Sequence, residues 1–251
     1  MDLTVFITGA TSGIGKATAE LLAKKKFRLI LCGRKEERLK ELESIFSQYT
    51  EVITLQFDVR NKKAVFTSIE SLPEAFKQID VLINNAGNAH GLTTIQEGNI
   101  DDWEAMLDIN VKGLLYVSRA ILPKMIEKNS GFIVNIGSTA GKEVYSSGNV
   151  YCASKSAVNT LNKGMRMDLN QYNIRVSAIH PGLVKTGFSE VRFKGDKKRA
   201  EKVYQGYKAL DPKDIADIIH FVITRPYHVN IEDLVVYPSA QASATIINKN
   251  K

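Results

Sequence analysis

The fold is decided by the stretch Thr8-Gly9-Ala10-Thr11-Ser12-Gly13-Ile14-Gly15, which joins an apolar run to a helical pattern. Residues 3–7 are apolar and rich in β-branched side chains, which indicates a buried strand. Residues 14–26 place apolar side chains at helical spacing. Glycines allow a tight turn and a close backbone approach to a pyrophosphate, and the following helix N-terminus favours negative charge. In this strand–turn–helix context the stretch predicts a dinucleotide site, whereas the glycine spacing alone would indicate little.

The rest of the chain repeats the alternation of strand and helix. Strands are expected at 27–32, 52–57, 80–83, 131–136, 174–179 and 234–237, and helices at 35–48, 62–72, 100–128, 150–172 and 212–224. Gly113 could interrupt the longest helix. This alternation predicts a parallel sheet with helices on both faces. We therefore expect one α/β domain over residues 1–251, a Rossmann-type doubly wound sheet of about seven strands. A less regular segment around 183–210 is expected to cover the substrate.

The composition is that of an ordinary globular protein, with 251 residues, 44% hydrophobic and 24% charged. No apolar run approaches the twenty or so residues that span a bilayer, and the N-terminus lacks a signal-peptide pattern. Cys32 and Cys152 are too few for a disulfide framework. These features predict a cytoplasmic protein with no membrane partner.

The net charge is +7, and the densest basic run lies at 194–202. A basic patch can be the footprint of nucleic-acid binding, but no aromatic residues interleave with this run at stacking spacing. We interpret the charge as a solvated surface whose field favours anionic ligands, and we expect no nucleic-acid partner. The histidines lack metal-ligand spacing, so no metal is expected, and His180 is interpreted as a strand-end residue rather than a catalyst.

The candidate motifs share a position, because each follows an expected strand. Sheets of this class bind ligands outside the carboxyl ends of their strands. The motifs are 9–15, Gly33-Arg34, Asp58-Val59, 84–87, Ser138 and Pro181-Gly182. Their common placement supports a single site more strongly than any one motif does.

The end of the second strand, Gly33-Arg34-Lys35, indicates which dinucleotide binds. NAD sites usually offer Asp or Glu here to the ribose hydroxyls, whereas this chain has no acid before Glu36. Arg34 could reach a 2′-phosphate with its planar guanidinium, and Lys35 would add charge. The alternative is that both are solvated residues at a helix start. We favour NADP over NAD.

Tyr151 and Lys155 stand four residues apart on the expected helix 150–172, so they share one face. A tyrosine with a pKa near 10 is a poor acid–base group at neutral pH. An ammonium about 4 Å away would stabilise a phenolate by up to ~4 kcal/mol at an effective dielectric constant of about 20. We therefore expect Lys155 to lower the pKa of Tyr151 toward a range useful for catalysis. Together with the glycine turn, this pair suggests hydride transfer between a nicotinamide and a carbonyl.

A second copy of the Tyr-x-x-x-Lys pattern runs from Tyr204 to Lys208. It neither opens a long helix nor follows a strand that ends in a serine. We interpret it as surface.

In order and spacing, these motifs resemble the classical short-chain dehydrogenases/reductases over nearly the whole chain. The matching pieces are the turn 8–15, Asp58, Asn84-Asn85-Ala86-Gly87, Asn110, Ser138, Tyr151-x-x-x-Lys155 and Pro181-Gly182 with Thr186. The resemblance implies that Tyr151 is the general acid in reduction and the base in oxidation. It implies that Ser138 orients the substrate oxygen and that Lys155 holds the nicotinamide ribose. Asn110 would anchor a water that relays protons to Lys155.

The resemblance also implies the cofactor contacts. They are Gly9, Ala10, Thr11, Ser12, Gly13, Ile14, Gly15, Arg34, Lys35, Asp58, Val59, Asn85, Ala86, Gly87, Tyr151, Lys155, Pro181, Gly182, Leu183, Val184 and Thr186. Asp58 and Val59 would contact adenine, Asn85 the adenosine-side ribose region, and 181–186 the nicotinamide end. Many NADP-using members carry a basic residue inside the glycine turn, but this chain has Thr11-Ser12, so the phosphate would rest on Arg34 and its neighbours.

A closer resemblance is to the NADP-dependent 3-hydroxy acid dehydrogenases, which oxidise serine, allo-threonine and related acids or reduce malonic semialdehyde. It rests on residues 137–141, 148–151, 191–196 and 227–231. It implies hydride transfer at the C3 hydroxyl or carbonyl of a small 3-hydroxy acid, and a homotetramer. The alternatives are a reductase of another carbonyl, such as a 3-oxoacyl thioester or a diketone, and a non-catalytic dinucleotide-binding regulator. Intact Ser138, Tyr151 and Lys155 argue against the regulator.

A 3-hydroxy acid also needs a partner for its carboxylate. Arg192 is our candidate, because it lies in the irregular segment after 181–186 and because arginine can grip a carboxylate with two hydrogen bonds. The alternative is a solvated arginine in a basic loop.

Overall fold

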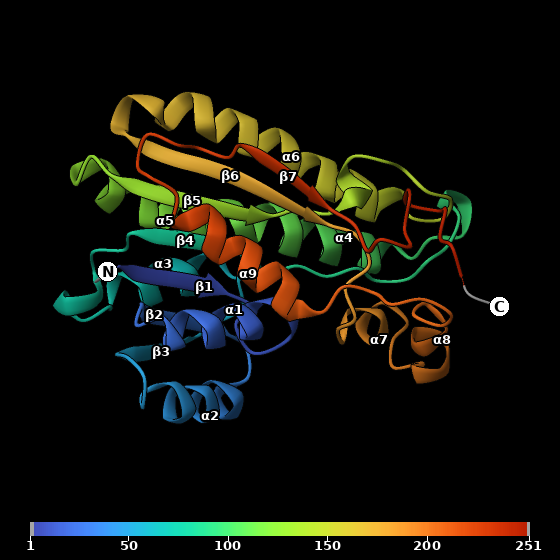
Figure 1. Cartoon of the computed structure of the whole chain (residues 1–251), viewed down its shortest axis with the longest axis horizontal. Helices are drawn as coiled ribbons and strands as arrows, with labels where there is room; N and C mark the ends of the chain where they lie inside the picture. The colour runs from blue at the N-terminus through green and yellow to red at the C-terminus, as the bar shows by residue number, and fades with distance from the viewer. Residues whose placement is uncertain (1–2, 250–251) are drawn as a thin grey trace.

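The centre of the molecule is a parallel sheet. The computed structural model describes residues 3–249, and within them seven strands lie in the order β3-β2-β1-β4-β5-β6-β7 (Figure 1). The strands are β1 (Thr4–Thr8), β2 (Arg28–Gly33), β3 (Val52–Gln56), β4 (Val81–Asn84), β5 (Gly131–Ile136), β6 (Ile174–Pro181) and β7 (Asp233–Val236). The chain starts near the middle and winds outward in both directions, so the strand order reverses beside β1. The predicted fold class is confirmed.

The strands end together at one edge of the sheet. β1 and β5 are buried at every residue, as expected for parallel strands covered on both faces. Thr8 at the end of β1 pairs with Cys32, and Asn84 at the end of β4 pairs with Asn135. Because neighbouring strands end at similar levels, the segments that follow them meet along this edge.

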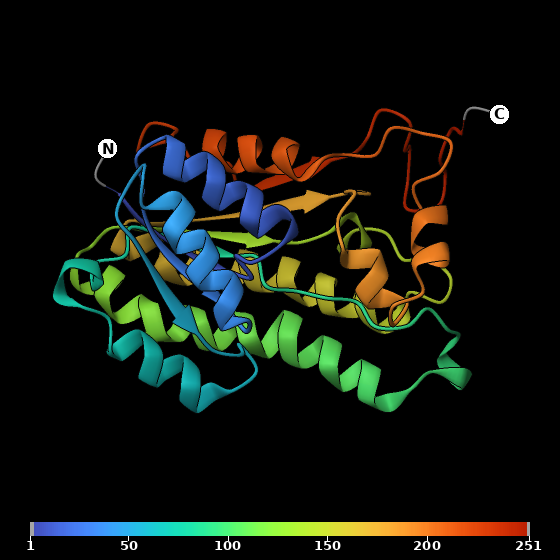
Figure 2. The same cartoon turned by 90° about the horizontal axis from the view of Figure 1, so that it is seen from below.

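Helices cover both faces of the sheet (Figure 2). One face carries α1 (Gly13–Lys24), α2 (Glu36–Phe46) and α9 (Pro212–Ile223), and the other carries α3 (Lys62–Glu70), α5 (Leu114–Glu127) and α6 (Asn149–Leu169). Leu22, Leu39 and Ile219 pack in the first layer, and Val65 and Val117 in the second. Burial of these apolar stripes holds the three layers together. Among residues 3–249, no helix combines the length and apolar character that a membrane crossing requires.

The expected helix 100–128 is divided, as the glycine suggested. It consists of α4 (Ile100–Leu107), a wide π-helical segment Asp108–Gly113, and α5. A Cβ added at Gly113 would lie 2.7 Å from Cγ2 of Val59, so the glycine lets this helix approach the segment after β3. Wide turns of this kind often mark functional sites. Here the turn carries the buried side chain of Asn110.

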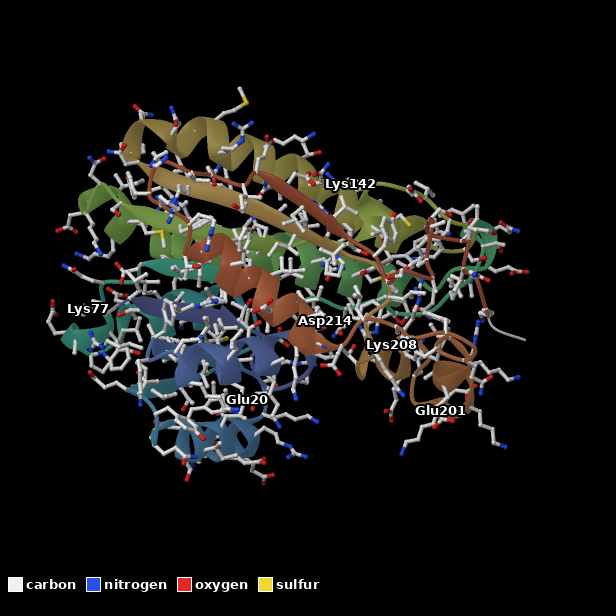
Figure 3. The ribbon with its side chains drawn as sticks, viewed as in Figure 1. Glu20, Lys77, Lys142, Glu201, Lys208 and Asp214 are labelled. Atoms are coloured by element: carbon white, nitrogen blue, oxygen red, sulfur yellow. The ribbon has the colours of Figure 1, made fainter. Side chains whose placement is uncertain are left out.

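The segment 183–210 folds into short helices beyond the carboxyl ends of the strands, α7 (Phe188–Arg192) and α8 (Lys197–Lys202) (Figure 1). Its second Tyr-x-x-x-Lys copy forms no helix in the described chain, because Gly206 takes a left-handed φ of 84°. Lys208 is exposed, as expected (Figure 3). Tyr204 is half-buried rather than exposed: its hydroxyl donates to the Val184 carbonyl at 3.0 Å and lies 2.9 Å from Ser189 Oγ.

Gly15→Ala should destabilise the fold. A Cβ there would overlap the Gly9 carbonyl oxygen and lie 2.5 Å from Nδ2 of Asn85, so the glycine turn would have to shift. We expect a loss of about 1–3 kcal/mol in the free energy of unfolding, measured by urea denaturation. Gly164→Ala is the matched control, because its Cβ would meet nothing within 4 Å on α6. It should stabilise the protein by about 0.5–1 kcal/mol, and similar effects from both variants would contradict this account.

Candidate active site

A cavity of about 600 Å³ runs along the carboxyl ends of the strands. Its size is typical of sites for small ligands and cofactors. It is lined by the segments that follow β1 to β6, together with α7 and its neighbours. Strand ends and irregular backbone thus face the same space, as the shared placement of the motifs predicted.

Most of the predicted cofactor residues line this cavity. They are Gly9, Thr11, Ser12, Gly13, Ile14, Arg34, Asp58, Val59, Asn85, Ala86, Gly87, Tyr151, Lys155, Pro181, Gly182, Leu183, Val184 and Thr186. The predicted Ala10, Gly15 and Lys35 lie outside the lining. Ala10 is fully buried, Gly15 packs on the turn itself, and Lys35 is exposed at the start of α2.

The glycine turn has the backbone geometry of an anion site. Gly9 and Gly13 take φ values of +65° and +52°, which L side chains rarely adopt. Ser12 precedes α1 without a side-chain cap bond in the described chain, so the first N–H groups of the helix stay free beside the cavity. Asn85 holds the turn by donating from Nδ2 to the carbonyls of Thr8 at 2.9 Å and Gly9 at 3.2 Å. This cradle fits the pyrophosphate of a dinucleotide.

Two arginines flank one carboxylate at the β2–β3 end of the cavity. Arg34 Nη1 lies 3.9 Å from Asp58 Oδ2, and 58% of the Arg34 side chain is exposed. Arg60 grips the same carboxylate through Nη2 at 2.7 Å and Nε at 3.1 Å. Burial alone would raise the pKa of Asp58, but the hydrogen bonds from Arg60 outweigh it and lower that pKa. Arg60 was not among the predicted site residues, although its place two residues after Asp58 was a usable signal.

Ser138, Tyr151 and Lys155 line the cavity together. Ser138 Oγ accepts a hydrogen bond from Ala140 N at 3.1 Å, which leaves its proton free to donate. The Tyr151 ring packs 5.6 Å from the Phe188 ring and is 8% exposed. Lys155 is buried, and its Nζ donates to the Ile136 carbonyl at 2.9 Å.

Asn110 lies behind this group rather than in the lining. Its Oδ1 accepts from Asn88 N at 2.9 Å, and its Nδ2 donates to Asn88 O and Ser154 Oγ, both at 2.9 Å. A Cβ added at Gly87 would lie 3.0 Å from Asn110 Oδ1 and 3.1 Å from Lys155 Nζ. Gly87 therefore keeps open the space between these two atoms. The relay of protons through Asn110 stays a prediction.

The pKa of Tyr151 does not move as predicted. Burial raises it well above 10, and the Ser138 hydrogen bond and the Arg192 charge lower it by less. Burial also lowers the pKa of Lys155 to about 8. The predicted lowering of the Tyr151 pKa was wrong. Residue spacing accounts for the charge of Lys155 but not for the free-energy cost of placing a phenolate inside the protein. At neutral pH Tyr151 is therefore a protonated acid.

Arg192 reaches the cavity beside the tyrosine. Its Nε donates to the Gly91 carbonyl at 3.1 Å, and its own carbonyl accepts from Gly91 N at 2.9 Å. Its guanidinium carbon lies 5.5 Å from the centre of the Tyr151 ring and 5.4 Å from that of Tyr145. Other basic candidates point elsewhere, since Lys194 pairs with Asp102 at 2.9 Å.

Several residues of this lining were not predicted, among them Tyr145 and the C-terminal residues Gln241, Ala244 and Ile247. Gln241 Oε1 accepts from Leu183 N at 2.9 Å and so ties this segment to the end of β6. Neither region carries a periodic pattern or a recognisable motif, so nothing in the sequence singled them out.

The comparisons with known proteins match this geometry. A family model described as short chain dehydrogenase matches residues 3–197. The chain belongs to the short-chain dehydrogenase family. The predicted family is thus confirmed, and so is the prediction that the protein is an oxidoreductase.

Named relatives extend over almost the whole chain. The NADP-dependent 3-hydroxy acid dehydrogenase of Schizosaccharomyces pombe is 45% identical over 253 aligned residues, covering 99% of this chain and 97% of that protein. Sulfoacetaldehyde reductase 2 of Chromohalobacter salexigens is 43% identical over 243 residues, covering 96% of each. The closed form of a serine dehydrogenase complexed with NADP+ superposes with a TM-score of 0.93 at 43% identity, covering 97% of this chain and 98% of that one.

Removing the buried ammonium should change how stability depends on pH. The pKa of Lys155 is about 8 in the folded chain against 10.5 when unperturbed, so between these values the unfolded state binds more protons. The free energy of unfolding should therefore rise with pH across this interval, by up to about 3 kcal/mol, and Lys155→Met should lack this rise. Urea denaturation of both proteins between pH 7 and 10.5 measures the difference. Lys163→Met, on the exposed side of α6, controls for the loss of a lysine, and a parent–Lys155→Met difference that is constant with pH would refute the assignment.

Arg34→Ala should weaken binding of NADPH and spare NADH, because only NADPH offers a 2′-phosphate. A charge-assisted contact of roughly 1.5–3 kcal/mol corresponds to a rise of about ten- to a hundredfold in KM. Steady-state kinetics with both cofactors measure it. Arg38→Ala removes an exposed arginine that pairs with Glu41 on α2 and should leave both KM values unchanged. An equal loss for NADH and NADPH would count against a phosphate contact.

Proposed function

We propose that the protein is an NADP-dependent oxidoreductase that transfers hydride between the nicotinamide and C3 of a small 3-hydroxy acid. Substrates of the serine, allo-threonine, or 3-hydroxypropionate and malonic semialdehyde type fit this description. The observation that carries the proposal is a cation beside the reacting tyrosine, because Arg192 and Tyr151 face one cavity with 5.5 Å between guanidinium and ring. The relatives named above support it.

The chain's own residues fit the cofactor. The free N–H groups at the start of α1 would hold the pyrophosphate, and Arg34 beside Asp58 and Arg60 would hold the 2′-phosphate. The segment 181–186 would hold the nicotinamide end. Bound NADP would donate or accept the hydride.

Tyr151 would be the residue that transfers the proton. In reduction, its protonated hydroxyl would donate to the substrate oxygen as the carbonyl carbon gains the hydride, and the product is the alcohol. Ser138 would keep its proton and donate a hydrogen bond to the same oxygen, which orients that oxygen. Oxidation runs the same steps backward and needs the phenolate, which burial disfavours. Lys155, held by the Ile136 carbonyl, would carry the nicotinamide ribose.

The carboxylate of a 3-hydroxy acid would lie against Arg192. Tyr145 also lines the cavity, with its ring centre 5.4 Å from the same guanidinium carbon, and its phenol would share the anion. Sulfoacetaldehyde, named for one relative, is also a small aldehyde with an anionic group, so a sulfonate belongs to the same test. A diketone or a thioester would offer no such group.

We also propose a cytoplasmic homotetramer with neither nucleic acid nor membrane as a partner. The resemblance to the family implies that the helices α4–α5 and α6 pair between copies. Leu107, Leu115 and Met167 on these helices are exposed apolar side chains. Burying such side chains against a second copy would remove them from water. The segment 183–210 is proposed to cover the substrate.

Arg192→Ala should discriminate between charged and uncharged substrates. We expect a loss of about 2–4 kcal/mol in kcat/KM for a 3-hydroxy acid, because a charged partner would be left unpaired, and a far smaller loss for its uncharged ester. Assays of acid and ester on parent and variant give a double cycle, and the ester also controls for the lost bond to Gly91.

Arg192→Lys keeps the charge without the planar fork and should recover part of the activity. Serine, 3-hydroxypropionate, malonic semialdehyde, sulfoacetaldehyde and acetoacetyl thioester should be scanned on the parent enzyme by NADPH fluorescence. A coupling near zero between Arg192 and the carboxylate would remove this arginine from the site. A preference for the thioester or a diketone would overturn the substrate class.

A further inference from the structure

His180 lies directly behind the active-site serine. It is completely buried near the carboxyl end of β6, and its Nδ1 lies 3.3 Å from the carbonyl oxygen of Ser138. A Cβ added at Gly137 would overlap the His180 ring, so the glycine leaves room for it. A buried imidazole in contact with the backbone of a reacting residue is a candidate for setting that residue's position.

An ion pair holds the far side of the ring. Nε2 of His180 lies 3.5 Å from Oδ2 of Asp233, and Lys142 pairs with the same carboxylate. Asp233 pairs with Ala178 in the register of β6 and β7, so its side chain lies on the face that His180 also uses. Lys142 also donates to Asn159 Oδ1 of α6 at 2.8 Å. The contacts of His180, Asp233 and Lys142 therefore connect the Ser138 turn, β7 and the helix that carries Tyr151.

The ring is neutral, and hydrogen-bond geometry assigns its single proton to Nδ1 rather than to Nε2. Burial, together with the charge of Lys142, lowers the pKa of His180 to about 4. Nδ1 faces a carbonyl, which can only accept, so Nδ1 carries the proton. Nε2 has no hydrogen-bond partner among residues 3–249, because its approach to Asp233 lacks hydrogen-bond geometry. The Lys142 ammonium offsets the repulsion between the Nε2 lone pair and the carboxylate.

The Ser138 carbonyl therefore accepts two hydrogen bonds. One comes from Gly141 N at 2.9 Å, inside the turn, and the other from His180 at 3.3 Å, outside it. The first closes the turn, and the second fixes where the turn sits relative to β6. The side chain of Ser138 moves with this peptide unit, so its hydroxyl depends on both.

We propose that His180 is a positioning residue, whose Nδ1–H bond to the Ser138 carbonyl and wedge beside Gly137 aim the Ser138 hydroxyl at the substrate oxygen. The inference rests on the role of Ser138 in the proposed function. Through His180, contacts made by β7 outside the cavity influence the position of the Ser138 hydroxyl.

Two substitutions of similar size separate the hydrogen bond from the bulk of the ring. His180→Asn can place an amide N–H near the Nδ1 position, whereas His180→Gln moves its amide toward Asp233. We expect kcat within about twofold of the parent for His180→Asn, and about five- to tenfold lower for His180→Gln and His180→Leu. The KM for NADPH should not change in any of them. Equal kcat values for Asn and Gln would overturn the proposal, and this comparison stands even where His180→Leu does not fold.

A double-mutant cycle with Ser138→Ala shows whether His180 acts through the serine. Once the hydroxyl is absent, His180→Gln should lower kcat no further, whereas a general structural role would lower it by the same factor in both backgrounds. Thermal melting of all variants records any loss of stability. If Ser138→Ala is impaired and the His180 variants are not, this inference alone fails. If Ser138→Ala keeps the parent kcat, the mechanism under the proposed function fails, and the inference with it.

Discussion

The two-sided burial of the parallel sheet is the constraint on which the rest of the molecule depends. Helices on both faces leave strand ends as the place where backbone groups can meet a ligand, and the register brings those ends to one edge. Gly9, Ser138 and Pro181 therefore meet around one cavity, although the chain between them passes through most of the domain. The chemistry of the site follows from this topology before any single side chain is considered.

The same burial acts against the charges that catalysis needs. Tyr151 and Lys155 are both buried where a charge costs free energy. The Tyr151 phenol therefore stays protonated, and the Lys155 ammonium loses its proton more readily. The groups that oppose this effect on Tyr151 are the hydroxyl of Ser138 and the guanidinium of Arg192. Both also line the cavity, so in the proposed function substrate binding and proton transfer would share residues.

Much of the fold was predictable because its signals are local. Hydrophobic periodicity located the strands and the main helices, and a single glycine marked the break before α5. That residues from the segments 9–15, 84–87 and 181–186 line the cavity followed from strand ends alone. Contacts between distant segments were not predictable: Tyr204 on Val184, and His180 between Ser138 and Asp233. The raised pKa of Tyr151 was missed for the same reason, since burial is a property of the folded surroundings and not of residue spacing.

The two hydrogen bonds between Gly91 and Arg192 affect the entropy change when an anion binds. An arginine in solution samples many rotamers, and restricting them on binding costs free energy. Here the backbone N–H of Gly91 and the Nε bond to its carbonyl already restrain the residue, while the terminal nitrogens of the guanidinium take no part in either bond. An anion that meets these nitrogens finds them already oriented, so less conformational freedom is lost when it binds. The left-handed φ of 70° at Gly91 gives that backbone its geometry, which explains why a glycine stands opposite the arginine.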